Sequence, residues 1–446
     1  MMKSYKYRLY PTKAQEEAFA QHLGCVRFIY NWALETKNKA YIKDKTKMSF
    51  FDLSAKLPAL KKENPWLSEV NAQALQSSLR NLDNAYTNFF RRVKQGAKEV
   101  GFPKFKSRKN KQSFQCPQRV SLDFENGKIS IPKIFEIKVV FHRKFKGEVK
   151  TTTISKTKSG KYFVSVLVED SKVLPAKPKI DPKTAIGIDL GLKDFAVLST
   201  GEKIANQRFN EKAAKRIAKL NRKMAKQKTM NKGVHTKNRE KTRVKLARLY
   251  EKVSNQRDDF LHNLSTRLIR ENQTICLEDL NVSGMVKNHK LSGSIASASW
   301  SAFVRMLIYK CEWYGKNLVF IGRFEPSSKM CSDCGWTKQD LKLSDREWVC
   351  QKCGVEHDRD VNAAVNIKTF ALHNQNLIKE KIPLHERKST LGEIEACKAR
   401  SGIKRNKTKA KVLAKHDEAL LRIRDGENDT SKAAILEKTL SSDRVW

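Results

Sequence analysis

Three acidic segments, far apart along the chain, constrain its fold more than any other feature. Two are short apolar strands that end in a carboxylate, and the third is a carboxylate at the start of a helical pattern; they are residues 185–191, 274–280 and 357–364. The acidic residues are Asp189, Glu278 and Asp360. Side chains alternate along a strand, so Asp189 shares a face with Gly187 and Gly191, where a ligand has room to approach.

Each carboxylate also has a structural interpretation. Asp189 alone could be a turn or capping residue, and Glu278 an ordinary strand-end carboxylate that faces water. Asp360 could cap the helix that follows it, although Asp358 could be the cap instead. Taken together, an Asp at the end of one strand, a Glu at the end of another and an Asp at the start of a helix indicate a divalent-metal site. Such a site would catalyse the cleavage of nucleic acid.

The charge of the chain points to the same partner. There are 90 Lys plus Arg against 47 Asp plus Glu, a formal net charge of +43 over 446 residues. Such an excess attracts a polyanion, and nucleic acid is the default choice. A membrane surface is the competing polyanion, but no apolar run approaches the ~18 residues of a span, and the N-terminus does not resemble a signal peptide. We expect a soluble, cytoplasmic, nucleoid-associated protein with no membrane partner and no small-molecule substrate.

Four of the nine cysteines form two C-x-x-C pairs that predict a structural zinc site. They are Cys331, Cys334, Cys350 and Cys353, and a 15-residue interval separates the pairs. This is the spacing of a zinc ribbon, and four thiolates close a tetrahedral shell. Gly335 and Gly354 follow the pairs and permit tight turns. A redox dithiol is the alternative, but it needs only one pair. The other five cysteines are interpreted as inert thiols in a reducing compartment.

The N-terminal part of the chain changes its hydrophobic period once. Residues 5–10 alternate like a strand, and Thr12 with Gln15 forms a capping-box start for a helix. Helical spacing continues to about residue 98. From about residue 117 the period becomes two, with turn signals at Asn126-Gly127 and Ser159-Gly160. We therefore predict a mostly helical unit followed by a small antiparallel barrel or sheet, which the first strand could complete.

Two basic stretches and one small-residue stretch carry weaker predictions. Residues 102–111 interleave aromatic rings with cations and suit stacked bases beside phosphates, although a solvated loop is the alternative. Seven Lys and Arg residues between Lys212 and Lys226 crowd one predicted helix, which indicates a nearby polyanion. The Ser/Gly-rich run at 292–299 is interpreted as a mobile loop beside the active site or as a plain linker.

Several motifs together resemble the TnpB (OrfB) proteins of insertion-sequence transposons, relatives of the type V CRISPR effectors. The motifs are residues 187–191 (GIDLG), 277–280 (LEDL), 326–335 (PSSKMCSDCG) and 358–364 (DRDVNAA), with 7–12 and 26–32 near the N-terminus. The resemblance covers roughly residues 1–370. It implies an α/β multidomain protein in which an RNase H-like (RuvC) nuclease domain carries an inserted zinc ribbon, beside a helical recognition domain and a small β-barrel.

The resemblance also implies a division of the chain into domains. The expected segments are the first strand of the β-barrel at 1–10, the helical recognition domain at 11–116, the β-barrel (wedge) domain at 117–180, the RuvC domain at 181–325 and 357–380, the zinc ribbon at 326–356, and a basic, partly disordered tail at 381–446. We match no family motif to the tail. We expect it to order, if at all, on RNA.

The function implied by the resemblance is RNA-guided cleavage of DNA. The partners would be a guide RNA from the transposon end and double-stranded target DNA. Carried over by motif, Asp189, Glu278 and Asp360 would be the catalytic triad that binds Mg²⁺, and Asp358 ranks second. Three hard oxygen donors suit Mg²⁺. Two such ions ~4 Å apart would hydrolyse a phosphodiester bond. An RNA-guided repressor without cleavage and an RNase H-like transposase remain as alternatives.

Overall fold

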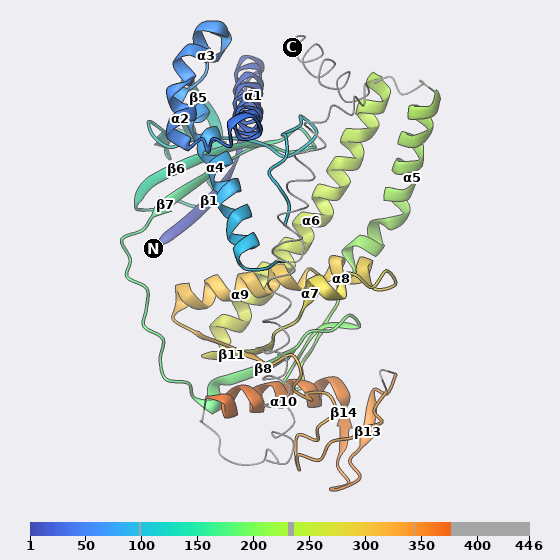
Figure 1. The fold of residues 1–446 in the computed structure, drawn as a ribbon. Helices are drawn as coiled ribbons and strands as arrows, with labels where there is room; N and C mark the ends of the chain where they lie inside the picture. The colour runs from blue at the N-terminus through green and yellow to red at the C-terminus, as the bar shows by residue number, and fades with distance from the viewer. Residues whose placement is uncertain (98–99, 231–235, 343, 376–446) are drawn as a thin grey trace. The chain divides into compact units, whose positions relative to one another are not determined.

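The computed structural model describes residues 1–97, 100–230, 236–342 and 344–375, in two compact units that divide between Asp170 and Ser171 (Figure 1). The tail at 381–446 lies outside the described residues. Within these residues, no helix has both the length and the apolar character needed to cross a membrane. The expected α/β multidomain class is confirmed.

The N-terminal unit combines helices with one antiparallel sheet. Its elements are β1 (Met2–Tyr10), α1 (Lys13–Asp44), α2 (Phe50–Ala55), α3 (Leu57–Glu63), α4 (Ala72–Lys94), β2 (Gln112–Cys116), β3 (Ser121–Asp123), β4 (Lys128–Ile131), β5 (Ile134–Val140), β6 (Glu148–Lys156) and β7 (Tyr162–Glu169). The sheet order is β2-β6-β7-β1-β5-β4-β3. The first strand therefore lies in the middle of the sheet, paired with β7 on one side and β5 on the other.

Helix α1 begins where the capping box predicted. The Thr12 hydroxyl accepts a hydrogen bond from the Gln15 amide, and the Gln15 side chain accepts one from the Thr12 amide. The apolar stripe that follows, including Phe19 and Ile29, is buried. It packs with α4 and with sheet residues such as Val164 into one continuous core. Burial of this stripe, rather than helix propensity, supplies most of the stability of such a helix.

The C-terminal unit is built on a second, mixed sheet. Its elements are β8 (Ala185–Asp189), β9 (Asp194–Leu198), β10 (Lys203–Ala205), α5 (Phe209–Met230), α6 (Lys237–Glu271), β11 (Thr274–Glu278), α7 (Val282–Met285), α8 (Ser292–Ala298), α9 (Trp300–Tyr314), β12 (Asn317–Ile321), β13 (Glu347–Val349), β14 (Glu356–Asp358) and α10 (Arg359–Asn374). The sheet order is β10-β9-β8-β11-β12. Strands β8, β11 and β12 are parallel, whereas β9 and β10 run antiparallel.

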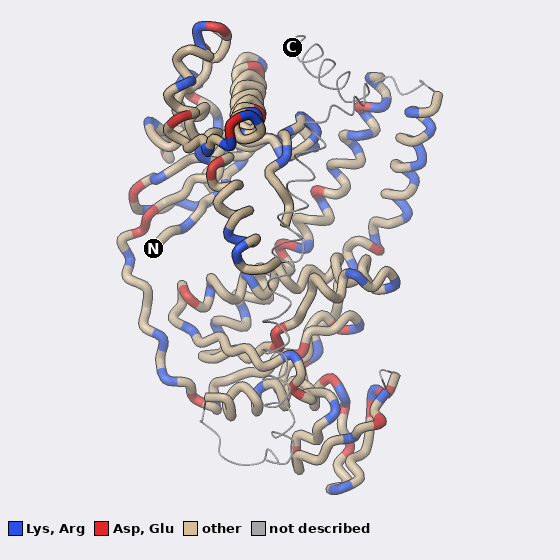
Figure 2. The backbone as a smooth tube through the Cα atoms, in the orientation of Figure 1, with Lys and Arg blue, Asp and Glu red and all other residues tan. Residues whose placement is uncertain are grey.

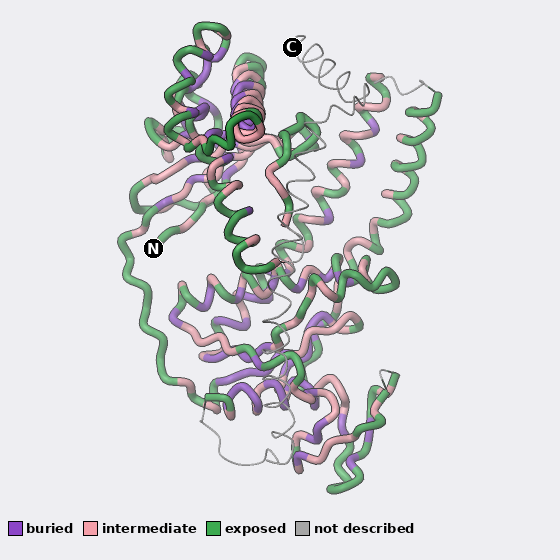
Figure 3. Tube along the Cα trace, viewed as in Figure 1, coloured by how far each residue is buried: buried purple, intermediate pink, exposed green. Residues whose placement is uncertain are grey.

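Helices cover both faces of this sheet, and the buried residues concentrate there (Figures 1 and 3). Ile188 and Leu277 point to the face that packs on α6 and α9. Cys276 points to the opposite face and packs on Ile367 and Phe370 of α10. The strands are buried on both faces, which explains why they read as continuous apolar runs in the sequence.

The loop predicted for residues 292–299 is wrong. Residues Ser292–Ala298 form the short helix α8, and Ile295 and Ala298 are buried in the core. Two apolar side chains three residues apart lie on the same side of a helix, so they anchor this segment despite its small polar neighbours.

Candidate metal centre and nucleic-acid interface

Neighbouring parallel strands place two of the predicted carboxylates side by side. Strands β8 and β11 pair with Ile188 opposite Leu277, so the next residue of each strand, Asp189 and Glu278, leaves the sheet at the same edge. Paired strands lie about 4.8 Å apart. Because side chains alternate, both carboxylates belong to the face that α10 covers. The register of this pair therefore brings together acids that lie 89 residues apart in sequence.

Gly187 allows α10 to lie close enough to add the third carboxylate. A Cβ atom at this position would lie 2.0 Å from the carbonyl oxygen of Ala364 and 2.8 Å from the amide nitrogen of Lys368. The face that the sequence showed to be free of bulk is therefore occupied by a helix. Asp360 lies in the first turn of that helix and faces the carboxyl edge of the strands.

The pKa of Asp189 reflects its burial and the charges of the other two carboxylates. Burial, together with the negative charges of Asp360 and Glu278, raises the pKa of Asp189 from 3.8 to about 7. The Arg359 guanidinium opposes this rise. Burial also raises the pKa of Glu278, with a contribution from Asp279. A cluster of partly buried like charges favours a bound cation, because the cation offsets both the desolvation and the repulsion.

The carboxylates are near one another but do not form a closed single-ion cage. Among the described residues, the groups whose three or more ligand atoms all lie within 4.8 Å of one another are found in the cysteine region.

Asp358, the second choice from the sequence, has a structural role. It is the N-cap of α10, and its carboxylate accepts hydrogen bonds from the amides of Asp360 and Val361 at 3.1 and 3.0 Å. It also accepts one from Lys203. Although burial opposes it, the hydrogen bond from Lys203 and those from the helix amides hold the pKa of Asp358 below its usual value.

Asp279 has an ion-pair partner, whereas its neighbour Glu278 has none among the described residues. The Asp279 carboxylate binds the Arg323 guanidinium, with O···N distances of 2.7 and 2.8 Å. The Glu278 carboxylate has no hydrogen bond or ion pair within the described part of the chain. An acidic side chain without a partner remains available for a metal, whereas Asp279 is already neutralised. The ion pair with Arg323 was not predicted, because its partner lies 44 residues away.

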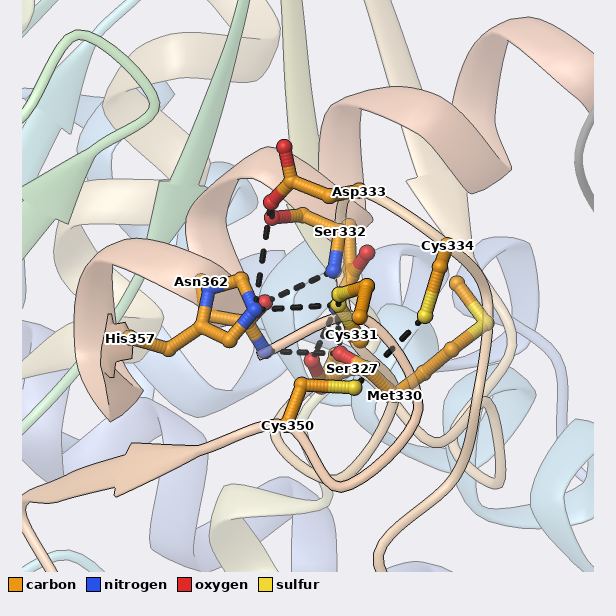
Figure 4. A network of polar contacts seen from close by, with 11 residues as sticks. Ser327, Met330, Cys331, Ser332, Asp333, Cys334, Cys350, His357 and Asn362 are labelled. Carbon is orange, nitrogen blue, oxygen red and sulfur yellow. Dashed lines mark hydrogen bonds and ion pairs between the residues drawn. The ribbon is translucent and has the colours of Figure 1, made fainter. Parts of the chain in front are cut away.

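The four predicted cysteines come together in a group that could hold a metal ion. Figure 4 shows three of them, Cys331, Cys334 and Cys350. The Sγ atoms of Cys334 and Cys350 are 3.5 Å apart, and those of Cys331 and Cys353 are 3.6 Å apart. Gly335 and Gly354 have positive φ values of 75° and 73°, and their amides donate to the carbonyls of Cys331 and Cys350. These are the tight turns that the sequence predicted.

Residues that the sequence analysis did not single out surround this cysteine group. His357 Nε2 lies 3.0 Å from the Cys331 Sγ, and the imidazole packs against the Trp348 ring at 4.8 Å between centroids. Asn362 and Asn366 of α10 are buried and bind the backbone beside Cys331. The Asn of the motif at 358–364 was visible in the sequence, but its partners were not.

Helices α5 and α6 pack side by side as a hairpin that carries many Lys and Arg residues (Figure 2). A groove of about 610 Å³ lies between them, lined by five cations, which are Arg216, Lys219, Lys223, Lys241 and Lys245. None of these five forms an ion pair within the described residues. Of α5, only a stripe that includes Ile217 and Leu220 is half-buried. Unpaired like charges on facing helices favour an anionic ligand, as the sequence predicted for α5.

The stretch at 102–111 is only partly available to a ligand. Phe102 packs into the N-terminal core, with ring centroids 5.4 Å from those of Tyr86 and Phe89. Lys106 Nζ lies 3.8 Å from the Tyr30 ring centroid. Phe105 remains 51% exposed. The interleaved pattern therefore serves internal packing at two positions, so our prediction of a stacking surface is too broad.

Three family profiles match parts of the chain. The OrfB profile of the IS605 type, described as "Probable transposase", matches residues 163–289. A "Cas12f1-like, TNB domain" profile matches residues 300–367, and a "Helix-turn-helix domain" profile of the OrfB type matches residues 1–46. Over this last range the structure contains the strand β1 and the single helix α1.

Relatives match over most of the chain. A protein of Streptomyces pristinaespiralis with the name "Putative RNA-guided DNA endonuclease" is 41% identical over 377 residues, which cover 83% of this chain and 89% of the relative. InsQ of Escherichia coli K12, named in the same way, is 30% identical and covers 82% of this chain and 91% of the relative. A solved structure of a Cas12f1–sgRNA–target DNA complex aligns at 13% identity with a TM-score of 0.43, over 82% of this chain and 98% of that chain.

Proposed function

This chain belongs to the TnpB (OrfB) family, and we propose that it is an RNA-guided DNA endonuclease that hydrolyses phosphodiester bonds in target DNA. Family membership rests on the 41% identity to the Streptomyces pristinaespiralis relative, which the alignment covers over 89% of its length. The proposed partners are a guide RNA from the transposon end and double-stranded target DNA. The basic α5–α6 hairpin supports contact with such polyanions.

The observation that carries the proposal is the convergence of three carboxylates at one edge of the sheet. Asp189 and Glu278 leave adjacent strands, and burial together with the negative charges of Asp360 and Glu278 raises the pKa of Asp189. We propose these three residues as the catalytic, Mg²⁺-binding triad of a RuvC-type nuclease domain with the RNase H-like fold. Asp358 is not proposed as a ligand, because it caps α10 and binds Lys203.

The donor set fits Mg²⁺. All three groups are carboxylates, and hard oxygen ligands are those that Mg²⁺ prefers. The chemistry supplied by bound Mg²⁺ is activation of a water on one side of the scissile phosphate and stabilisation of the leaving oxygen on the other. Asp189 would hold the ion in its deprotonated form, because the positive charge would offset the burial and the like-charge repulsion that raise its pKa. Glu278 would be free to bind the ion, because its carboxylate forms no ion pair within the described residues.

The cysteine group fits structural zinc. A Zn–S distance of about 2.3 Å gives a tetrahedron with edges of about 3.8 Å. The separations of 3.5 and 3.6 Å between paired Sγ atoms are close to this edge. Four thiolates leave no open position, so the proposed role is to hold the ribbon rather than to act on a substrate. Two pairs in one cluster also argue against a redox dithiol.

The two alternative functions differ in what they require. A repressor that binds without cleavage would tolerate the loss of an acidic residue, and all three are present in this chain. A transposase would recognise transposon ends without RNA. Treatment of the purified complex with RNase before the assay separates this alternative from guided cleavage, because only a guided enzyme would lose its target.

The test is cleavage of a plasmid library by the protein co-expressed with its flanking noncoding RNA in Mg²⁺. We expect guide-dependent cuts beside a shared short motif. Asp189→Ala and Glu278→Gln should abolish cutting, whereas the matched control Asp279→Asn should retain it, because Asp279 is held by Arg323. Binding of the target without any cutting by the unmodified protein would favour the repressor instead.

A further inference from the structure

The last strand of the cysteine region continues directly into the helix that carries the third carboxylate. Strand β14 ends at Asp358, which is also the N-cap of α10, and Asp360 lies in the first turn. Strand β13, which precedes Cys350 in the chain, pairs with β14 through Glu347 and Asp358. The proposed zinc ribbon and the proposed catalytic residue therefore share one short stretch of backbone.

Asn362 connects this helix to the first cysteine turn through both ends of its amide. Its Oδ1 accepts a hydrogen bond from the Ser332 amide at 2.9 Å, and its Nδ2 donates to the Met330 carbonyl at 2.8 Å. The residue is 2% exposed. Met330 and Ser332 flank Cys331, so one side chain holds the backbone on both sides of a proposed zinc ligand (Figure 4).

Asn366, one turn further along α10, strengthens the same connection. Its Nδ2 donates to the carbonyls of Met330 and Ser327, at 2.6 and 2.8 Å. The residue is fully buried. Two buried amides directed at one loop are costly to desolvate unless their partners stay in place, so they fix the loop against the helix.

Three further contacts hold the start of α10 against the ribbon. His357 Nε2 lies 3.0 Å from the Cys331 Sγ, directly before the N-cap. The Arg346 carbonyl accepts a hydrogen bond from the Arg359 amide at 2.8 Å, and the Arg346 guanidinium lies 3.5 Å from an Asp360 carboxylate oxygen. The position of Asp360 is thus held from both the cysteine turn and the ribbon's second half.

We propose that Asn362 is a positioning residue that couples metal loading of the cysteine site to the placement of Asp360. A zinc ion bound by the four cysteines would fix the backbone around Cys331. Because Asn362 binds that backbone on both sides of Cys331, the same ion would also fix the first turn of α10. The coupling rests on the proposed nuclease function for its consequence in catalysis. Because coupling between sites is reciprocal, the loaded ribbon should favour binding of the catalytic ion, and the catalytic ion should favour retention of zinc.

The first test measures backbone hydrogen exchange of residues 358–364 in the full-length protein, with zinc bound and after removal by a chelator. Neither RNA nor DNA is added. Removal of zinc should accelerate exchange in this segment by about tenfold or more, because local opening becomes easier. Exchange in α4, in the other compact unit, serves as the internal control. Unchanged exchange at 358–364 after zinc removal would overturn the proposal.

The second test uses Asn362→Ala, with Asn366→Ala as a second variant and Asn374→Ala as the matched control. Asn374 is an exposed asparagine of the same helix. With Co²⁺ in place of zinc, the thiolate absorption bands of Asn362→Ala should match those of the unmodified protein, because all four ligands remain. The Mg²⁺ concentration for half-maximal cleavage should rise about tenfold, with target binding unchanged.

The two tests distinguish failure of the proposed coupling between the cysteine site and Asp360 from failure of the proposed nuclease function. Exchange that responds to zinc in a protein that never cuts DNA would support the coupling and reject the nuclease. Cleavage with the same Mg²⁺ requirement in Asn362→Ala, Asn366→Ala and Asn374→Ala would retain the nuclease and reject the coupling. Altered thiolate bands in Asn362→Ala would show that the residue shapes the zinc site itself, and the positioning role would then be wrong.

Discussion

A Cβ atom on Gly187 would lie 2.0 Å from the carbonyl oxygen of Ala364, so strand β8 and helix α10 approach each other as closely as backbone allows. This approach decides where Asp360 lies relative to Asp189, because Asp189 follows Gly187 by two residues on the strand and Asp360 precedes Ala364 by four on the helix. Any side chain at position 187 would push the helix outward.

Gly187→Ala should therefore impair both stability and cleavage. The added methyl group has no room unless the backbone of α10 moves, and overpacking of this kind costs about 1–3 kcal/mol. Denaturant unfolding should show this loss, and cleavage at saturating Mg²⁺ should fall by at least about tenfold. Gly293→Ala, on α8 of the same unit, is the matched control, since a Cβ there meets nothing within 4 Å. Equal behaviour of the two variants would contradict the packing argument.

The metal-free protein should lose stability as the pH rises from about 4 to about 7. Asp189 has its pKa raised to about 7 in the folded chain, so the folded state holds a proton that the unfolded state has released. The shift corresponds to at most about 4 kcal/mol, and because the site keeps some contact with solvent we expect about 1–2 kcal/mol.

The measurement is the melting temperature of the unmodified protein and of Asp189→Asn from pH 4 to pH 8 in chelator. The variant cannot ionise at this position, so it should become the more stable of the two above about pH 7. Addition of Mg²⁺ should reverse the order, because only the carboxylate binds the ion. A constant difference across the pH range would show that Asp189 is not perturbed.

The Mg²⁺ requirement for cleavage should also depend on pH. Below about pH 7 a proton competes with the ion for Asp189, so the half-maximal Mg²⁺ concentration should rise by about tenfold for each pH unit. Titrations of cleavage against Mg²⁺ at pH 6, 7 and 8 measure this. Target binding in the same buffers provides the control, since it does not require the triad.

Neutralisation of the α5–α6 groove should weaken nucleic-acid binding in a salt-dependent manner. In the triple variant Lys219→Gln, Lys223→Gln and Lys241→Gln, the slope of log K against log salt should become shallower by about 0.7–0.9 for each phosphate that the groove no longer neutralises. The control is Lys39→Gln, because that lysine is already paired with Glu35. An unchanged slope in the triple variant would place the bound backbone elsewhere.

Lys310 should matter for stability rather than for catalysis. It is 6% exposed, and its ammonium donates to the His262 carbonyl and the hydroxyls of Ser265 and Thr266, at 2.9, 2.7 and 2.7 Å. Lys310→Ala leaves a cavity and unpaired acceptors, at a cost of about 2–4 kcal/mol. Lys310→Met keeps the aliphatic volume without a buried charge, so its loss in denaturant unfolding should be smaller. Equal losses would show that the charge dominates.

Local patterns predicted the elements that depend on local causes. The capping box at Thr12, the strands that carry Asp189 and Glu278, and the turns at Gly335 and Gly354 follow from residues within a few positions of each other. The structure agrees at each of these places. Family motifs added the expectation that the distant acids act together, which periodicity alone could not supply.

Features that depend on partners distant in sequence were missed. Nothing near Asn362 in the sequence indicates that Met330 and Ser332 satisfy its amide, and nothing near Phe102 indicates that it packs on α4. The small residues around Ile295 suggested a loop because their burial against the core could not be seen. In each case tertiary packing decided the role of a residue whose local sequence allowed several.

The order in which the chain is synthesised has a consequence for the cell. Asp189 and Glu278 emerge from the ribosome first, and α10, with Asp360, follows only after the cysteine region. One face of the central strand β8 therefore stays uncovered until α10, more than 160 residues downstream, has been synthesised. A prematurely terminated product would carry two of the three acids and an exposed apolar surface. Without Asp360 such a fragment would lack one member of the proposed triad, so we expect it neither to cut DNA nor to fold stably.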